Sequence, residues 1–187
     1  MSIDALRDQL PSYAKDLSLN LSSLMNETVL SDQQKLGCFL ASAHAVGQPA
    51  LVQAMEQAAA TLDPAVRDAA RAAAAIMGMN NIYYRALHLM HNQEYRTLPA
   101  KLRMNVIANP GAAKLDFELW CTAVSAIHGC GACLDAHENT LREHGATNVQ
   151  VQASLRIAAV VHAVGRVLAG EAARTGDVVT TDTAVAV

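Results

Sequence analysis

Two cysteines three positions apart carry the clearest chemical signal in the sequence. Cys130 and Cys133 flank Gly131 and Ala132, and His137 follows the second cysteine by four residues. Two thiols at this spacing on a helix reach bonding distance with little backbone movement, so the pair can alternate between a dithiol and a disulfide. An imidazole one turn further along can accept or return a proton. The pattern therefore indicates a redox dithiol.

A helix that begins near Cys130 would place these groups at its N-terminal end. Cys133 and His137 would then share one face of the helix, while Cys130, between two glycines, is expected to be the more accessible sulfur. The free amide groups and the positive end of the helix dipole stabilise a thiolate there. Such a position can lower the pKa of a cysteine from about 8.5 to roughly 3.5–7.5. We therefore expect a reactive thiolate in this turn.

Three other interpretations fit the same residues. The two cysteines could be small buried residues, although the flanking glycines would then have no packing rationale. His137 could be an ordinary core histidine bonded to a carbonyl group. A zinc ion could be held by four residues of suitable types, which are His128, Cys130, Cys133 and His137. All four lie within ten consecutive residues and no second CxxC exists, whereas most structural zinc sites draw pairs of ligands from separate elements.

Glu118 is the next candidate, because it shares a polar stripe with Thr122 and Ser125 on an otherwise apolar helix. A helix rises 1.5 Å per residue, so Glu118 lies about 18 Å along the helix from Cys130. Spacing alone does not bring its carboxylate to the cysteines, and a bend or a steep helix crossing would be needed. A glutamate in the first turn of a helix can equally be a surface residue favoured by the dipole.

The remaining cysteines, Cys38 and Cys121, lie on apolar faces without a suitable polar neighbour. A free cysteine in such a place behaves as a small hydrophobic residue. Both are therefore predicted to be core residues that take no part in the reaction of the CxxC pair.

The composition indicates helices and excludes several kinds of partner. The chain of 187 residues is 52% hydrophobic but only 4% aromatic, which favours packed helices over a β-sandwich. A formal charge of −3 gives no electrostatic footprint for nucleic acid. The N-terminus lacks the apolar core of a signal peptide, and the most apolar segment, residues 157–165, is shorter than a membrane span, which needs about 20 residues. We predict a cytoplasmic protein, in which thiols stay reduced.

Helix signals run through most of the chain and predict an all-α fold. Ser31 and the pair Asp63–Pro64 carry residue types that open helices. Asp116 can cap the helix that precedes the CxxC. No convincing alternating strand precedes the C-terminal end. The prediction is a single all-helical domain over residues 1–175, followed by a loose tail over residues 176–187.

An internal duplication is also predicted. The segments "AIMGMNNIYYRA" (75–86) and "AIHGCGACLDAH" (126–137) share the pattern Ala-Ile-x-Gly. When the two segments are aligned on this pattern, the first copy keeps the helix but has inert side chains, and the second copy carries the reactive cysteines and the histidine. The expected boundaries are a degenerate repeat over about 63–110 and a catalytic repeat over about 116–172.

In the order and spacing of its motifs, the chain resembles alkyl hydroperoxidase D, within the carboxymuconolactone decarboxylase-like superfamily. Similar segments occur along nearly the whole chain, among them "AAAAIMGMNNIYYR", "FELWCTAVSAIHGC" and "CLDAHENTLREHG". The combination of Glu118, the two cysteines and His137 is far more specific than a bare CxxC. The resemblance implies an all-helical, duplicated fold that assembles as a homotrimer.

The resemblance also implies an antioxidant activity, that of a thiol-dependent alkyl hydroperoxide reductase and disulfide reductase of the lipoyl-dependent peroxiredoxin type. Such a protein would bind no cofactor. It would pass electrons from dihydrolipoamide, on a lipoyl-bearing dehydrogenase component, to a partner peroxiredoxin of the alkyl hydroperoxide reductase C type. A non-enzymatic, zinc-stabilised helical module and a carboxymuconolactone decarboxylase-like enzyme are the alternatives, and the decarboxylase would not need the CxxC.

Residue roles follow from the same resemblance. Cys133 would be the nucleophilic thiolate that meets the peroxide and passes through a sulfenic acid. Cys130 would donate a proton, close the redox disulfide and form the mixed disulfide with the peroxiredoxin. His137 and Glu118 would be the proton relay.

One position departs from the family pattern. Ala132 lies between the cysteines, where a well-known member of the family has a histidine. Whatever that histidine contributes, this protein must do without it or use His128, which lies outside the CxxC.

Overall fold

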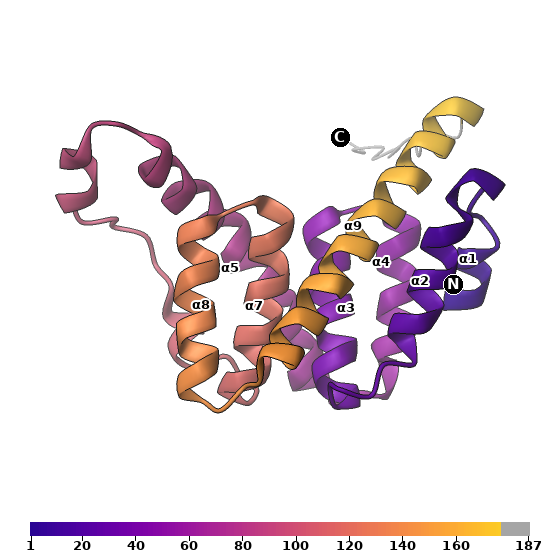
Figure 1. Ribbon diagram of the computed structural model, residues 1–187, viewed down its shortest axis with the longest axis horizontal. Coiled ribbons are helices and arrows are strands. Elements are labelled where there is room, and N and C mark those ends of the chain that lie inside the picture. The colour runs from indigo at the N-terminus through magenta and orange to yellow at the C-terminus, as the bar shows by residue number, and fades with distance from the viewer. Residues whose placement is uncertain (177–187) are drawn as a thin grey trace, which may run out of the picture.

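The computed structural model describes residues 1–176 and has the all-α fold that the sequence predicts (Figure 1). Nine α-helices and no strand occur in these residues. They are α1 (Ile3–Arg7), α2 (Lys15–Met25), α3 (Asp32–Val46), α4 (Pro49–Ala58), α5 (Pro64–Leu89), α6 (Asn105–Ala108), α7 (Lys114–His128), α8 (Gly131–Glu143) and α9 (Asn148–Thr175). The tail predicted over residues 176–187 lies outside the described residues, apart from Gly176.

Two helices begin where their capping signals predict. Ser31 forms a capping box at the start of α3, in which its hydroxyl accepts from the N–H of Gln34 and the Gln34 side chain accepts from the N–H of Ser31. Asp63 accepts from the N–H of Ala65 at the start of α5. These side chains satisfy amide groups that the first helical turn leaves free.

Asp116 does not cap α7 as predicted. The helix begins two residues earlier, at Lys114, and Asp116 is a buried residue of its first turn. Its carboxylate accepts hydrogen bonds from the side-chain amides of Gln33 (2.6 Å) and Gln34 (2.9 Å), in the first turn of α3. The buried charge is therefore satisfied by another helix, and it joins the starts of α3 and α7.

Helices α3 and α7 form the centre of the bundle. They pack against each other, and each of them also packs against both α5 and α9. In Figure 1, α9 runs diagonally across the front of the molecule. The largest side chains of the core come from the two central helices, and they are Phe39, Phe117 and Trp120.

The close contact between α3 and α7 depends on a glycine. The indole N–H of Trp120 donates to the carbonyl oxygen of Gln34 at 3.1 Å, and the ring lies over Gly37. A Cβ atom at position 37 would lie 2.2 Å from Cε2 of the indole, which is far inside van der Waals contact. The absence of a side chain at Gly37 therefore lets Trp120 lie flat against α3.

Gly37→Ala is expected to lower the free energy of unfolding by about 1–3 kcal/mol, because the buried indole must shift. Urea denaturation measures this loss. Gly78→Ala is the matched control, since Gly78 lies in the middle of α5 and an added methyl group would meet no other atom there. The control should gain about 0.5–1 kcal/mol, because alanine favours the helix. Equal stability of Gly37→Ala and the wild type would contradict the packing described.

The helices do not follow the predicted repeat over 63–110 and 116–172. Residues 75–86 lie inside the uninterrupted helix α5, whereas residues 126–137 span the end of α7 and the start of α8. The chain turns there because Gly129 adopts a left-handed conformation (φ 65°). The shared Ala-Ile-x-Gly pattern therefore occurs in two different backbone conformations.

A different internal relation fits the helices. α3 and α7 each have 15 residues, and each ends at a left-handed glycine, Gly47 (φ 75°) or Gly129 (φ 65°). Each is followed by a shorter helix and then by a long one, α5 with 26 residues or α9 with 28. α5 packs on α7 as α9 packs on α3. The structure thus pairs α3–α4–α5 with α7–α8–α9.

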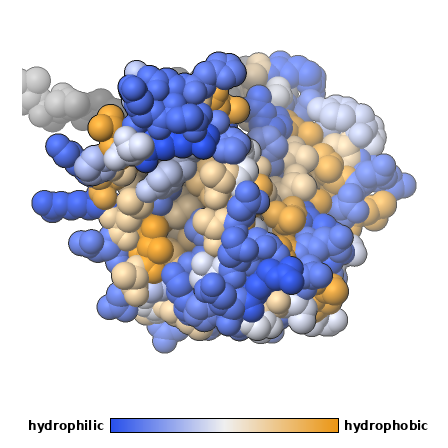
Figure 2. All heavy atoms as spheres, turned by 60° about the vertical axis from the view of Figure 1, so that its left-hand side comes forward, coloured by the Kyte–Doolittle hydropathy of each residue, from blue (hydrophilic) through white to orange (hydrophobic). Residues whose placement is uncertain are grey.

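The segment from the end of α5 to the start of α7 projects from the bundle (Figure 1). It carries large apolar side chains that are exposed in the single chain, namely Leu89, Met90, Tyr95 and Leu98. Figure 2 turns this side of the molecule forward and shows apolar residues between polar ones. Exposed apolar surface of this kind is typical of a contact with another protein.

Among the described residues, α9 is long and apolar enough to cross a membrane by length and composition alone. In its most apolar window, 44% of the residues are buried inside the molecule. The core helix of a globular protein passes the same test, so this feature is weak evidence for a membrane span.

Candidate active site

The cysteine pair lies in the turn between α7 and α8. The N–H of Gly129 donates to the carbonyl oxygen of Ala126 (3.2 Å), and the N–H of Cys130 donates to that of Ser125 (3.1 Å). These two bonds form a Schellman motif, in which the second residue beyond the helix folds back onto its last turn. α8 begins immediately after Cys130, as predicted, so that Cys133 lies in its first turn.

Cys130 and Cys133 are joined as a disulfide, with their Cα atoms 5.3 Å apart. This separation is ordinary for a disulfide. The expectation that Cys130 is the more accessible sulfur is wrong for this disulfide form: Cys130 is fully buried, while Cys133 is 6% exposed. The Schellman motif folds Cys130 back onto the last turn of α7, through the hydrogen bond from its N–H to the carbonyl oxygen of Ser125.

Glu118 and His137 meet across the α7–α8 hairpin. Nδ1 of His137 lies 2.6 Å from Oε2 of Glu118, and Nζ of Lys114 lies 2.6 Å from Oε1. Both members of the carboxylate–imidazole pair are buried. One oxygen of the Glu118 carboxylate therefore binds the ammonium group of Lys114, and the other accepts a hydrogen bond from Nδ1 of His137. The bond to Nδ1 orients the His137 ring.

These contacts set the charge of Glu118. Burial would raise the pKa of its carboxyl group, but the hydrogen bonds from His137 and Lys114 oppose burial and hold the pKa below the ordinary value. Glu118 is therefore ionised at neutral pH. A buried carboxylate in this state can stabilise a positive charge on His137 when the imidazole takes up a proton.

The second ring nitrogen of His137 faces α5. Its Nε2 lies 3.2 Å from the sulfur of Met77, a buried residue. Cys133 lies one turn earlier on the same buried face of α8 as His137, as the spacing predicts. In this disulfide form, Met77 therefore occupies the nitrogen that would exchange protons with a thiol.

Glu118→Gln is expected to change how stability depends on pH. A carboxyl group whose folded pKa is lowered stabilises the fold above its ordinary pKa of 4.5, and this contribution is lost as the pH falls through the folded pKa. The variant should be less stable than the wild type at pH 7, by about 1–3 kcal/mol, because His137 and Lys114 lose their buried partner. The difference should shrink in acid.

Urea denaturation at a series of pH values measures this effect. Glu138→Gln is the matched control, since Glu138 is exposed on α8 and pairs with the exposed Arg142. Its stability should stay close to that of the wild type at every pH. If the free energy of unfolding of Glu118→Gln stays below that of the wild type by the same amount down to acid pH, the lowered pKa of Glu118 is contradicted.

His128 does not replace the histidine missing at Ala132. Its Nδ1 accepts a hydrogen bond from the side-chain amide of Asn81 (3.1 Å), and no hydrogen bond joins it to either cysteine among the described residues. Burial lowers the pKa of its imidazole, and the nearby charge of Arg85 adds to this, against carbonyl contacts that raise it. His128 is therefore a neutral, structurally engaged ring.

The structure also bears on the zinc alternative. Within residues 1–176, no three His, Cys, Asp or Glu side chains come together as metal ligands. The two histidines of the proposed set are engaged elsewhere, His128 with Asn81 and His137 with Glu118. The disulfide occupies both sulfurs. These contacts disfavour a zinc site at this turn.

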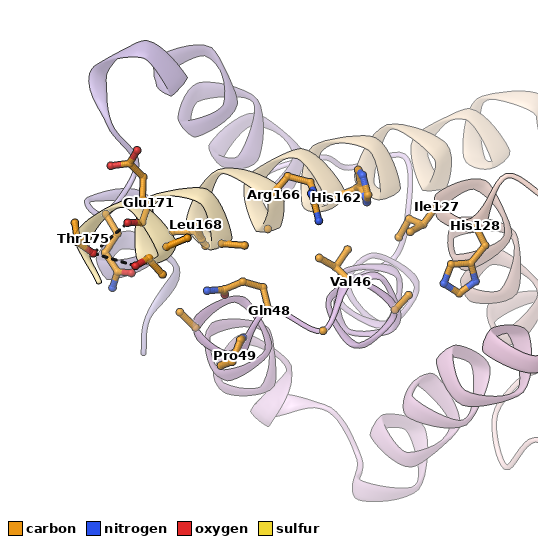
Figure 3. Close-up of a pocket in the computed structure, with 18 residues that line it drawn as sticks. Val46, Gln48, Pro49, Ile127, His128, His162, Arg166, Leu168, Glu171 and Thr175 are labelled. Carbon is orange, nitrogen blue, oxygen red and sulfur yellow. Dashed lines mark hydrogen bonds between the residues drawn. The ribbon is translucent and has the colours of Figure 1, made fainter. Parts of the chain in front are cut away.

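A large open pocket of about 910 Å³ is lined mainly by residues of α9 and of the α3–α4 turn. Figure 3 shows it between the α3–α4 turn, which includes Val46 and Gln48, and the side chains of α9, with His128 at one end. Neither cysteine of the disulfide lines it, and neither does His137 or Glu118. The pocket is therefore not the active-site cleft.

Cys38 and Cys121 are core residues, as predicted. Both are fully buried and neither is in a disulfide. Burial raises the pKa of each thiol well above its ordinary value, and nearby carboxylates add to the effect, Asp116 for Cys38 and Glu118 for Cys121. Both thiols therefore stay protonated and unreactive at neutral pH.

Four residues of the site were not identified from the sequence. Lys114 precedes Glu118 by four residues, a spacing at which opposite charges meet on a helix, so a signal for it existed. Met77, Asn81 and Arg85 come from α5, and no local spacing links them to the CxxC. The one sequence signal for these α5 residues is a pair of adjacent asparagines, Asn80 and Asn81, in an otherwise apolar helix.

The model of the carboxymuconolactone decarboxylase family matches residues 93–174 of the chain. The chain is 61% identical over 174 residues to alkyl hydroperoxide reductase AhpD of Hyphomonas neptunium, covering 92% of this chain and 97% of the relative. It is 63% identical over 172 residues to AhpD of Maricaulis maris, covering 91% and 99%. The chain therefore belongs to the AhpD family, which confirms the resemblance found in the sequence.

Proposed function

We propose that the protein is an antioxidant, thiol-dependent alkyl hydroperoxide reductase and disulfide reductase of the lipoyl-dependent peroxiredoxin type. The observation that carries this proposal is the Cys130–Cys133 disulfide at the start of α8, one turn from the buried His137–Glu118 pair. Close relatives named alkyl hydroperoxide reductase support it. A decarboxylase would have no use for this pair.

The electrons are proposed to enter from dihydrolipoamide carried by a lipoyl-bearing dehydrogenase component. Its two thiols reduce the protein disulfide by exchange, which leaves lipoamide and the Cys130–Cys133 dithiol. The dithiol then reduces the disulfide of a partner peroxiredoxin of the alkyl hydroperoxide reductase C type and returns to the disulfide. Two electrons and two protons move in each step, and the chain needs no bound cofactor.

Direct reduction of a hydroperoxide would use the same dithiol. The Cys133 thiolate attacks the O–O bond, the alcohol leaves with a proton donated by Cys130, and Cys133 becomes a sulfenic acid. The thiolate of Cys130 then displaces hydroxide from the sulfenic acid and closes the disulfide. His137, oriented by Glu118, takes the proton that the Cys133 thiol first gives up and returns it to this hydroxide, which leaves as water.

Access to the two sulfurs sets a further requirement. Cys133 is the residue of the pair with some exposure in the disulfide form, so an incoming thiol is proposed to attack there first. Cys130 is fully buried, so its proposed mixed disulfide with the peroxiredoxin needs the turn to open. Exposed glycines on either side of Cys130, Gly129 and Gly131, allow the backbone to move there.

The proposed assembly is a homotrimer in the cytoplasm, without contact to nucleic acid or membrane. The exposed apolar side chains between α5 and α7, among them Leu89 and Leu98, support a contact between chains.

A reconstituted assay tests the proposal. The reduced chain is mixed with dihydrolipoamide and an alkyl hydroperoxide, with and without the peroxiredoxin, and the consumption of peroxide is followed. Consumption should need the chain, rise with the peroxiredoxin, and stop after the thiols are alkylated. Consumption no faster than with dihydrolipoamide and the peroxiredoxin alone would refute the proposal.

A further inference from the structure

Two side chains of α5 hold the end of α7, directly before the cysteine pair. Arg85 donates a hydrogen bond to the carbonyl oxygen of His128, the last residue of α7. Asn81 donates through Nδ2 to Nδ1 of His128 (3.1 Å) and accepts through Oδ1 from the hydroxyl of Ser125 (3.0 Å). Asn81 and Ser125 are fully buried, so these bonds are shielded from water.

These contacts fix the residues that position Cys130. Its N–H donates to the carbonyl oxygen of Ser125, and His128 precedes it by two residues. Asn81 binds the side chains of both of these residues. Cys133, in contrast, is held by the helical bonds of α8. The position of Cys130 relative to Cys133 therefore depends on how firmly the last turn of α7 is held.

The end of α3 provides an internal comparison with the end of α7, because α9 packs on α3 as α5 packs on α7. Asn81 is the eighteenth residue of α5, and Gly165 is the eighteenth of α9. Gly165 lies against Val46, the last residue of α3, as Asn81 lies against His128, the last residue of α7. A Cβ atom at position 165 would lie 2.5 Å from Cγ1 of Val46. The contact between α9 and the end of α3 is therefore apolar.

The counterpart of Arg85 on α9 is Ala169, the twenty-second residue of its helix as Arg85 is of α5. The residue that follows the left-handed glycine after α3 is Gln48, whereas Cys130 follows the left-handed glycine after α7. Of these two helix ends, the end of α7 is therefore the one that two polar side chains hold, and it is the one that precedes the cysteines.

We propose that Asn81 and Arg85 are positioning residues that favour closing of the Cys130–Cys133 disulfide. The disulfide itself ties the turn to α8, whereas in the dithiol form the bonds from α5 must keep the two sulfurs close. Without these bonds the dithiol gains conformational freedom, and the effective concentration of one thiol near the other falls. The inference rests on the proposed function, because it concerns the equilibrium of the same pair.

Arg85→Gln and Asn81→Ala are each expected to lower the equilibrium constant for disulfide formation about tenfold, which corresponds to a rise of about 30 mV in reduction potential. The full chain is equilibrated with mixtures of dihydrolipoamide and lipoamide, the free thiols are alkylated, and the two forms are counted by mass spectrometry. Arg85→Lys keeps a donor for the carbonyl oxygen and should recover most of the loss.

Arg96→Gln is the matched control. Arg96 also donates to carbonyl oxygens at a helix end, those of Leu87 and His88 in the last turn of α5. Its loss should leave the equilibrium constant unchanged. Asn81 is fully buried, so Asn81→Ala can fail to fold. Arg85 is half-buried, so the comparison of Arg85→Gln with Arg85→Lys decides the test in that case.

An unchanged equilibrium constant in Arg85→Gln, with a wild type that cycles, would overturn the positioning role alone. An equal change of the equilibrium constant in Arg96→Gln would also overturn the positioning role, because the effect would then come from a general loosening of α5. A wild type that forms no reversible disulfide would overturn the proposed function, and the positioning role with it.

Discussion

Cys133→Ser is expected to reduce hydroperoxide turnover to the rate measured without the chain, and Cys130→Ser to do the same. A serine hydroxyl neither forms a disulfide nor ionises near neutral pH, so neither variant can complete the electron transfer. The assay is the reconstituted system with dihydrolipoamide and the peroxiredoxin. The two variants should differ in one respect: Cys130→Ser retains the Cys133 thiol and can still accumulate a sulfenic acid with peroxide.

Cys38→Ala and Cys121→Ala are the controls for this experiment. Each removes a fully buried thiol whose pKa is raised well above its ordinary value. Turnover should stay near the wild-type rate in both. A normal rate in either CxxC variant, or a loss of turnover in either control, would contradict the assignment of the redox pair.

His137→Phe is expected to slow turnover at neutral pH by about 10²–10⁴-fold, the usual contribution of a positioned acid or base. The variant keeps a ring in the buried space between Glu118 and Met77 but removes the proton acceptor. The defect should shrink at alkaline pH, where the Cys133 thiolate forms without help. The measurement is the pH profile of peroxide reduction by the reduced chain.

His144→Phe is the control for the histidine substitution. His144 is an exposed residue just beyond α8, and its ring contacts only the carbonyl oxygen of Thr140 among the described residues. Its pH profile should match that of the wild type. A His137→Phe defect of equal size at every pH would show that the histidine acts through structure and not as a base.

Local features of the fold could be predicted from the sequence. The capping residues Ser31 and Asp63 open α3 and α5 as predicted, because a cap depends on residues two or three positions apart. Asp116 has the residue type of a cap, yet its carboxylate is bound by Gln33 and Gln34 of another helix. Contacts between distant segments of this kind leave no pattern in the local sequence.

The same limit applies to the site. The shared face of Cys133 and His137, on a helix that begins near Cys130, follows from helical spacing and is confirmed. The meeting of Glu118 with His137 depends on how α7 and α8 pack, so only the resemblance to the family indicated it. The burial of Cys130 depends on the hydrogen bonds of the turn, which residue types alone do not reveal.

The predicted repeat failed for a related reason. Shared residue types aligned the middle of α5 with the α7–α8 turn, although the two segments differ in backbone conformation. Helix lengths and the left-handed glycines at 47 and 129 define the relation that the structure supports. This relation also identifies Asn81 and Arg85 as polar residues of α5 whose counterparts on α9 are Gly165 and Ala169.

Counting the thiols through one redox cycle tests the central claim most directly. The chain contains four cysteines, and the account predicts that one equivalent of hydroperoxide removes two alkylatable thiols from the fully reduced, denatured protein. Mass spectrometry should locate the new disulfide in the peptide that spans residues 130–133, and dihydrolipoamide should restore both thiols. Retention of all four thiols, or a disulfide that involves Cys38 or Cys121, would contradict it.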